Sequence, residues 1–169
     1  MKLIKQFDET DCGAACLSMI ANHYGYHISV TDVRNRAGTD RLGTNLYGLI
    51  SAASELNLSA KALFSESKKI SRNLPVPFIM HINKENTTLH YIVVYKITNK
   101  FVYVADPEDR KKRIPVSTLE SSWTGYAIFI SLTPEFKYNK ENRFKLFSYL
   151  SLLKPHIKVI LLSIIASLM

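Results

Sequence analysis

The chain has 169 residues, of which 47% are hydrophobic and 21% charged, and its formal net charge is +8. This length supports one substantial hydrophobic core and excludes two large domains. Two cysteines are too few for the disulfide framework of a small secreted protein, and no low-complexity run or repeat points away from a globular fold.

Three helical patterns come first along the chain. Residues 11–24 carry apolar or small side chains at the spacing of one helix face. Ser29 is expected to cap a short second helix, which Gly38 closes. Thr44 is expected to open a third helix.

Strand patterns follow the helices. Five segments are dense in β-branched and aromatic residues or alternate in polarity, namely 59–64, 77–82, 90–97, 100–105 and 125–132. Helices followed by strands predict an α+β fold in which N-terminal helices pack on an antiparallel sheet. After Pro134 the sequence turns polar and basic, so the first domain is predicted to span residues 1–134.

The C-terminal part has a different composition. Residues 137–158 hold six Lys or Arg against a single acidic residue, and residues 159–169 are uncharged. A helix over this apolar run reaches about 16 Å, short of the ~30 Å hydrocarbon layer. It is either a C-terminal core helix or the start of a membrane-spanning helix. The second interpretation is favoured, which gives a basic linker over 135–156 and the opening of a transmembrane helix over 157–169.

Both cysteines lie in the stretch "QFDETDCGAAC", from Gln6 to Cys16. A zinc site needs four ligands and the chain has no second cysteine pair, while a disulfide within one helical turn is geometrically awkward. Free cysteines are often core residues, and Cys16, one turn inside the helix, is expected to be one. Cys12 lies in the first turn, where the helix dipole favours a thiolate, although Asp11 opposes that effect.

A nucleophilic cysteine needs a base that is oriented by a third group. His23 lies about 16 Å further along the same helix, and His27 and His156 are no better placed. His81 and His90 both fall in predicted strands. Only His90 has a carboxylate that the predicted hairpin could bring next to it.

That carboxylate is Asp106, which follows the next strand. A hairpin loop of Thr98-Asn99 alone puts His90 and Asp106 on opposite faces of the sheet. A three-residue loop over 97–99, with Asn99 in the left-handed conformation, puts them directly opposite each other on one face. The three-residue loop is therefore predicted. A β-bulge would have the same effect on an even-numbered loop.

Three motifs in this order, "QFDETDCGAAC", "HYIVVYKI" and "YVADPE", resemble the cytosolic cysteine peptidase domain of peptide-exporting ABC transporters. These are bacteriocin-processing, double-glycine-leader peptidases. The resemblance covers residues 6–125 and implies a papain-like fold. It implies Cys12 as nucleophile, His90 as general base, Asp106 as the residue that orients the imidazole, and Gln6 as the oxyanion-hole donor.

The resemblance also implies the substrate and the setting. The substrate is a precursor peptide whose N-terminal leader ends in Gly-Gly, and the leader docks as an amphipathic helix on an apolar surface that the sequence does not locate. The peptidase domain is expected to need no cofactor, whereas ATP and Mg belong to a separate nucleotide-binding domain. The expected partners are the transmembrane and ATPase domains of the same exporter, at the cytoplasmic face of a bacterial membrane.

Two other interpretations compete. A related but inactive domain that only binds leaders is the first, and the presence of Cys12, His90 and Asp106 argues against it. A nucleic-acid-binding domain is the second, suggested by the basic composition. The basic residues gather beside the apolar tail and the strands lack a basic-aromatic stacking pattern, so no nucleic-acid partner is expected.

Overall fold

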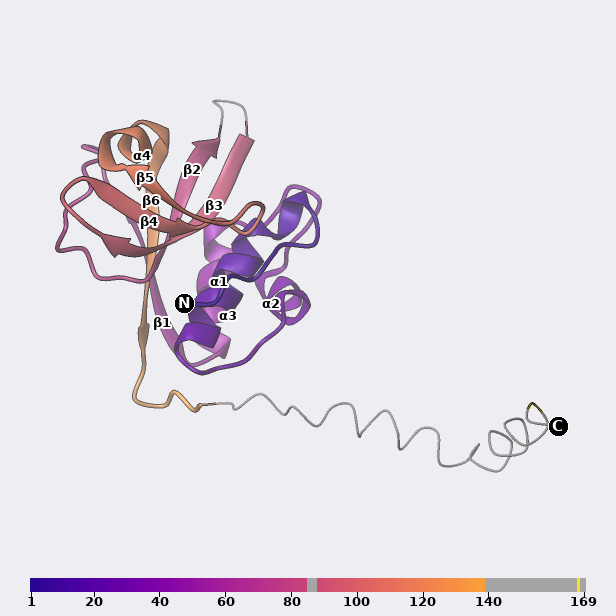
Figure 1. Cartoon of the computed structure of the whole chain (residues 1–169). Coiled ribbons are helices and arrows are strands. Elements are labelled where there is room, and N and C mark those ends of the chain that lie inside the picture. The colour runs from indigo at the N-terminus through magenta and orange to yellow at the C-terminus, as the bar shows by residue number, and fades with distance from the viewer. Residues whose placement is uncertain (85–87, 139–166, 168–169) are drawn as a thin grey trace. The chain divides into compact units, whose positions relative to one another are not determined.

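The computed structural model describes residues 1–84, 88–138 and 167, and the chain divides into two compact units, Met1–Asn139 and Lys140–Met169. The labelled helices and strands all belong to the first unit (Figure 1). The predicted linker lies outside the described residues from position 139 onward, and the predicted membrane segment does so except for Ser167. Within the described part, no helix combines the length and apolarity needed to cross a membrane.

The structure describes five helices, namely η1 (Glu9–Asp11), α1 (Cys12–His23), α2 (Val30–Ala37), α3 (Leu46–Glu55) and α4 (Val116–Ser122). Capping side chains mark the start of η1, α2 and α3. The predicted cap of α2 is confirmed: Ser29 Oγ accepts the Asp32 N–H at 3.1 Å, and Gly38 ends the helix at φ +60°. The third helix starts later than predicted, because Asn45, and not Thr44, accepts the Gly48 N–H at 2.8 Å.

Six strands form one antiparallel sheet in the order β1-β6-β2-β3-β4-β5. They are β1 (Leu58–Phe64), β2 (Phe78–Lys84), β3 (Thr88–Ile97), β4 (Phe101–Ala105), β5 (Lys111–Pro115) and β6 (Trp123–Leu132). The five predicted strands are confirmed with small shifts of their ends. The sequence analysis predicted neither β5 nor α4. The edge strand β5, "KKRIP", is short and mostly charged, so it lacks the usual strand pattern.

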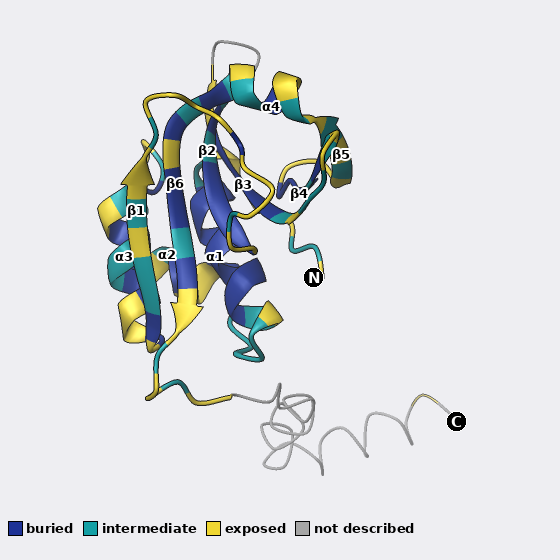
Figure 2. Ribbon diagram, turned by 90° about the vertical axis from the view of Figure 1, so that its left-hand side faces the viewer, coloured by how far each residue is buried: buried dark blue, intermediate teal, exposed yellow. Residues whose placement is uncertain are grey.

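Helices α1, α2 and α3 cover one face of the sheet, and α4 lies near β5 at one end (Figures 1 and 2). One buried cluster joins these three helices to the sheet, with Leu17, Ile20 and Leu49 among its members. A second cluster lies on the opposite face, where Leu119 of α4 and Trp123 join strand residues. The observed class is therefore the predicted α+β class, with helices packed on an antiparallel sheet.

The β3–β4 hairpin differs from the prediction in a way that matters for the site. Thr98 N–H donates to the Phe101 carbonyl at 2.9 Å, so the loop is the two residues Asn99 and Lys100. Among described non-glycine residues, positive φ occurs only at Asn57 and Lys68, so the left-handed Asn99 is wrong too.

A β-bulge then restores the predicted shared face, but not the predicted pairing of His90 directly opposite Asp106, because the register of Val93 with Ala105 continues to Asp106 opposite Ile92. Ile97 pairs with Val102, but from Val94 onward the register shifts by one residue, so that Val94 pairs with Val104. The extra residue in β3 returns His90 and Asp106 to the same face of the sheet.

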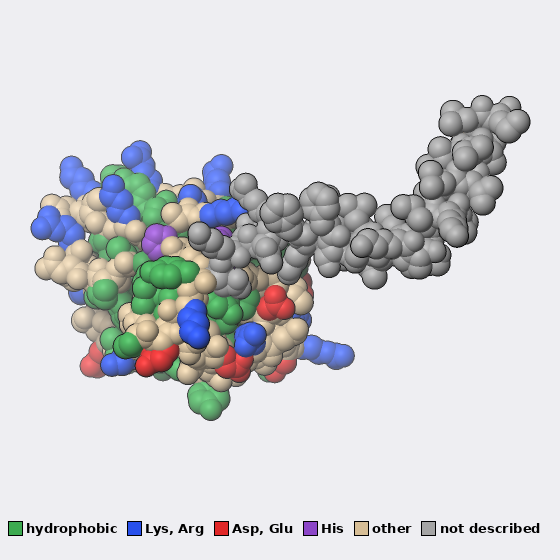
Figure 3. Space-filling view, turned by 90° about the horizontal axis from the view of Figure 1, so that it is seen from below, with side chains coloured by type: hydrophobic (Ala, Val, Ile, Leu, Met, Phe, Trp, Pro, Cys, Tyr) green, Lys and Arg blue, Asp and Glu red, His purple; other side chains and the backbone are tan. Residues whose placement is uncertain are grey.

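The surface charges of the first unit are mixed. On the face shown in Figure 3, several Lys and Arg side chains gather in the upper part, and acidic side chains lie among further Lys and Arg toward the lower edge.

Candidate active site

The start of α1 and the adjoining ends of β3 and β4 bring three predicted residues together. Cys12 is the first residue of α1, and His90 lies near the start of β3. Asp106 directly follows β4. The His90 Nε2 atom lies 2.9 Å from Asp106 Oδ1, and the Cys12 thiol lies close enough to the imidazole to raise its pKa. The side chain of His90 therefore connects the sulfur to the carboxylate.

Burial and hydrogen bonding shift the pKa values of His90 and Asp106 in opposite directions. Burial alone lowers the pKa of His90, but the hydrogen bonds with Asp106 and Cys12 outweigh it and raise the pKa to about 9. Burial likewise raises the pKa of Asp106, but the hydrogen bonds from His90 and Lys112 hold it well below its usual range. The geometry thus stabilises an imidazolium beside an ionised carboxylate at neutral pH.

Lys112 is a site residue that the sequence did not single out. It lies in β5, and its Nζ donates to Asp106 Oδ2 at 2.9 Å. The Glu108 N–H donates to the Oδ1 atom at 3.1 Å, so both oxygens of the buried Asp106 carboxylate are held. The unpredicted strand explains the omission, because Lys112 reaches Asp106 only when β5 folds back along β4.

The N-terminal segment with Gln6 is tied to the turn that follows Asp106. The Gln6 N–H donates to the Pro107 carbonyl at 3.1 Å, and Lys5 Nζ donates to the carbonyls of Glu108 and Asp109. The Gln6 side chain lines the same hollow as His90. Its Oε1 atom is buried and has no hydrogen-bond partner among the described residues. An unpartnered buried amide oxygen is costly, and functional sites are where such costs are found.

Asp11, which was expected to oppose a thiolate at Cys12, is paired. Arg34 of α2 donates to Asp11 Oδ1 at 2.7 Å and to Asp8 Oδ2 at 2.8 Å. Hydrogen bonds from Thr10 and then Arg34 lower the pKa of Asp8 to about 2. The guanidinium offsets the carboxylate next to the nucleophile and joins α2 to the start of α1.

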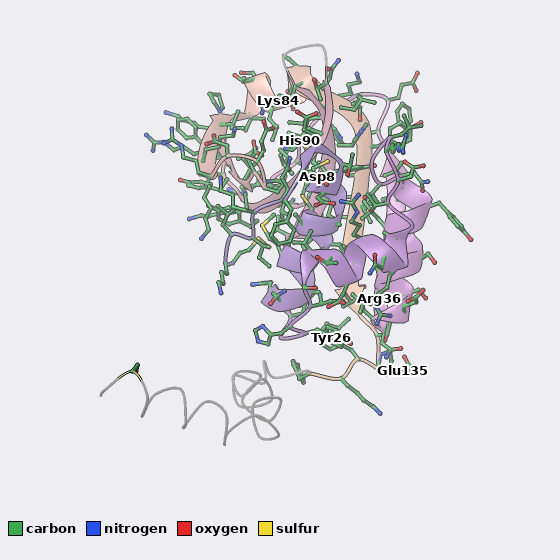
Figure 4. The ribbon with its side chains drawn as sticks, turned by 90° about the vertical axis from the view of Figure 1, so that its right-hand side faces the viewer. Asp8, Tyr26, Arg36, Lys84, His90 and Glu135 are labelled. Atoms are coloured by element: carbon green, nitrogen blue, oxygen red, sulfur yellow. The ribbon has the colours of Figure 1, made fainter. Side chains whose placement is uncertain are left out.

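The surface around these residues is a groove made of two adjoining hollows. One hollow, of about 280 Å³, is lined by Gln6 and His90, and the other, of about 330 Å³, by Cys12, His81 and Tyr91. Glu9 and Leu89 line both, so the hollows meet beside the Cys12–His90 pair. In Figure 4, His90 lies between Lys84 and Asp8 at one end of the molecule, whereas Tyr26 and Glu135 lie at the other.

The other candidates are placed elsewhere. Cys16 is fully buried among core residues, and both cysteines are free thiols. Among described residues, the one group of three potential metal ligands is His90, Asp106 and Glu108. The ammonium of Lys112 already binds this carboxylate, so the group fits an ion-pair network rather than a metal site.

Comparisons with known proteins identify the family of the chain. The peptidase C39 family model matches residues 1–135. The chain belongs to the peptidase C39 family. Membership supports the predicted class, a cysteine peptidase, and confirms the resemblance that the three motifs indicated.

Individual relatives point the same way. The chain is 38% identical over 165 residues to the lactococcin-A transport/processing ATP-binding protein LcnC of Lactococcus lactis, covering 96% of this chain and 23% of that protein. It therefore spans about a quarter of the length of such curated relatives.

Two solved structures are similar in fold. The peptidase domain of Streptococcus ComA, a bifunctional ABC transporter of a quorum-sensing pathway, matches with a TM-score of 0.72 and 32% identity, covering 78% of this chain and 98% of that one. A double-glycine-motif protease from an AMS/PCAT transporter, solved in complex with the leader peptide, matches with a TM-score of 0.71 and 29% identity, covering 78% and 91%.

Proposed function

We propose that the chain is a cysteine endopeptidase that removes the leader of a bacteriocin or pheromone precursor after a Gly-Gly site. The observation that carries the proposal is the His90–Asp106 pair, whose Nε2 and Oδ1 atoms are 2.9 Å apart, beside a Cys12 thiol that raises the pKa of the imidazole and lines an open groove. Nucleophile, base and orienting group stand in the order that peptide-bond cleavage by a thiol requires.

The reaction starts from a thiolate–imidazolium pair. Cys12 Sγ attacks the carbonyl carbon of the second glycine, and the developing oxyanion is stabilised by the Gln6 side-chain amide, a contribution of about 3 kcal/mol in comparable sites. His90 then transfers its proton to the leaving amine, and a thioester between Cys12 and the leader remains. His90 next takes a proton from water, whose oxygen attacks the thioester and releases the leader carboxylate and the Cys12 thiol.

The substrate class follows from the relatives and from the shape of the groove. LcnC is a transport/processing protein for lactococcin A, and the AMS/PCAT protease binds a leader peptide. Around Cys12 the walls are formed by Thr44, His81, Leu89 and Tyr91. Glycine beside the scissile bond suits a groove with these side chains in its walls because glycine brings none of its own.

The setting is proposed from the same relatives. Transmembrane and ATPase domains of one exporter are the partners, ATP and Mg belong to the ATPase domain, and the peptidase itself uses no cofactor. The domain occupies residues 1–134 on the cytoplasmic face of the membrane, and residues 135–156 and 157–169 lead into the first membrane helix. An inactive leader-binding domain is the alternative, which the contacts among Cys12, His90 and Asp106 disfavour.

The direct test is cleavage of a fluorogenic peptide that carries an amphipathic leader ending in Gly-Gly. The 169-residue chain is expected to cut it after the second glycine, as mass spectrometry of the products will show. Cys12→Ala should abolish turnover, whereas Cys16→Ala should retain most of it, since Cys16 is fully buried in the core. Leader binding without cleavage by the unsubstituted chain would establish the inactive alternative.

A further inference from the structure

His81 is an imidazole in the groove that the proposed mechanism does not use. It lies in β2, opposite Tyr91 of β3, and its ring packs on the Tyr91 ring with centroids 4.7 Å apart. Together with Cys12 it lines the hollow of about 330 Å³. Its place in the groove, beside the sulfur but without a carboxylate partner, raises the question of what its nitrogens bind.

The pairing of β2 with β6 is irregular at His81. Met80 pairs with Ala127 and Ile82 with Trp123, so that His81 faces the intervening residues 124–126. Gly125 adopts φ +100° there, a conformation that side chains disfavour. This local departure places the Thr124 hydroxyl against both the backbone and the ring of His81.

The hydrogen bonds of Thr124 determine which ring nitrogen of His81 carries the proton. The Thr124 hydroxyl donates its single proton to the His81 carbonyl at 2.9 Å. The same oxygen lies 2.9 Å from His81 Nδ1 and must therefore accept there, so Nδ1 bears the hydrogen. In a neutral ring Nε2 is then a bare acceptor.

Two observations describe that acceptor. His81 Nε2 makes no hydrogen bond within the described part of the chain and is not among its buried unpartnered atoms, so it is accessible. Burial, and then the charge of His90, lower the pKa of His81, which keeps the ring neutral. His81 and Cys12 line the same hollow, so an acceptor open to it can bind a donor of the substrate. The donors that a Gly-Gly segment offers are its backbone N–H groups.

We propose that His81 is a substrate-binding residue whose Nε2 accepts a hydrogen bond from a backbone N–H of one of the two glycines before the scissile bond. This inference rests on the proposed function and specifies how its site recognises a peptide without side chains. Thr124 is the positioning residue that fixes the tautomer. His81 takes no proton in the reaction.

A pair of near-isosteric variants tests the role of Nε2. In His81→Asn the amide reaches only the Nδ1 position, so it keeps the bond to Thr124 and loses the acceptor in the groove. In His81→Gln the amide oxygen reaches the Nε2 position and keeps that acceptor. With the fluorogenic Gly-Gly peptide and the 169-residue chain, kcat/KM is expected to fall about tenfold for Asn and to stay within about threefold for Gln.

Ester substrates identify the partner atom. Replacing one glycine before the scissile bond by glycolate removes a single N–H and leaves the shape nearly unchanged. For one of the two esters, kcat/KM with the unsubstituted chain should be about tenfold lower than for the all-amide peptide. With His81→Asn, the same ester and the all-amide peptide should give almost equal kcat/KM values. Equal losses for both enzymes with both esters would overturn the proposal, as would a fully active Asn variant.

Alkylation of Cys12 by iodoacetamide separates this role from damage to the catalytic pair. The alkylation rate should be unchanged in His81→Asn, because the small reagent needs no binding at Nε2. If the unsubstituted chain cleaves no Gly-Gly peptide, the proposed function fails and the inference fails with it. If it does cleave and the Asn variant cleaves equally well, only the inference fails.

Discussion

The first and second turns of α1 carry the same thiol in opposite surroundings. Cys12 faces the groove and the His90 imidazole, with charged residues around it. Cys16 is fully enclosed by core residues, and burial, followed by the charges of Cys12 and Asp106, raises the pKa of its thiol well above the usual value. One helical turn therefore separates the sulfur that we propose as the nucleophile from one enclosed in the core, and the neighbouring elements make the difference.

The contrast extends along the whole helix. At its N-terminal end, Arg34 offsets Asp11, and Lys112 holds Asp106 against His90. At the other end, Tyr26 packs against Phe136 with ring centroids 6.2 Å apart. The two ends lie on opposite sides of the molecule in Figure 4, with His90 near one and Tyr26 near the other. The ion pairs therefore lie at the end of α1 that holds the proposed active site, and aromatic packing stabilises the other end.

The largest expected effect concerns alkylation of the two thiols. In the folded chain Cys12 should react with iodoacetamide at least roughly a thousand times faster than Cys16, because Cys16 is exposed only when the fold opens. Mass spectrometry after a timed reaction should find one modified cysteine in native buffer and two in denaturant. Equal labelling of both thiols in native buffer would remove the distinction between the turns.

The next effect concerns the carboxylate that orients the base. Asp106→Ala should lower kcat/KM by roughly 100- to 1,000-fold, because His90 loses its orientation and the partner that favours its charged form. Asp109→Asn is the matched control, since Asp109 belongs to the same turn, is half exposed and meets Lys112 at 3.5 Å on the far side. Steady-state cleavage of the Gly-Gly peptide measures both, and a comparable loss in Asp109→Asn would argue for general damage to the turn.

The helices and most strands could be predicted because their signals are local. The spacing of apolar residues placed the first thiol at the start of α1, and Ser29 and Gly38 marked the ends of α2. The strand β5 has no such signal, since it is a charged edge strand whose partner is supplied by the fold. Because β5 could not be predicted, Lys112 could not be predicted as a site residue either, although its ion pair with Asp106 holds the carboxylate that binds His90.

The hairpin shows a different limit. The requirement that His90 and Asp106 share a face could be stated from the sequence, but two solutions satisfied it. The structure uses a two-residue loop, closed by Thr98, whose hydroxyl donates to the Phe101 carbonyl at 2.8 Å and accepts the Phe101 N–H at 3.1 Å. The compensating bulge depends on how β3 packs, which no local pattern specifies.

A smaller effect is expected from the lysine that shares Asp106. In the proposed mechanism the imidazolium of His90 is the working form. Its raised pKa of about 9 keeps it charged at neutral pH, so kcat/KM should fall as the pH rises through about 9. Lys112→Met should lower kcat/KM about tenfold at neutral pH, because one carboxylate oxygen is released. It should also move the alkaline limb upward by about one pH unit, since the imidazolium no longer shares the carboxylate with a cation.

Lys112→Arg provides the control for that change. It keeps a cation within reach of Asp106 Oδ2, so both the rate and the position of the alkaline limb should return most of the way to the original. A pH–rate profile for the three proteins is the measurement. An alkaline limb that does not move in Lys112→Met would mean that the lysine only supports the fold of β5.

The smallest effect on catalysis, and a clear one on stability, is expected at the second thiol. Cys16→Ala removes a fully buried sulfur from the core and should lower the free energy of unfolding by about 1–2 kcal/mol, while kcat/KM changes less than twofold. Cys16→Ser keeps the size but buries a hydroxyl in apolar surroundings, so it should cost more stability than alanine does. Urea unfolding of the three proteins, with cleavage rates measured in parallel, tests the order. If serine is tolerated better than alanine, the environment of Cys16 is polar, and the contrast between the two turns of α1 has to be redrawn.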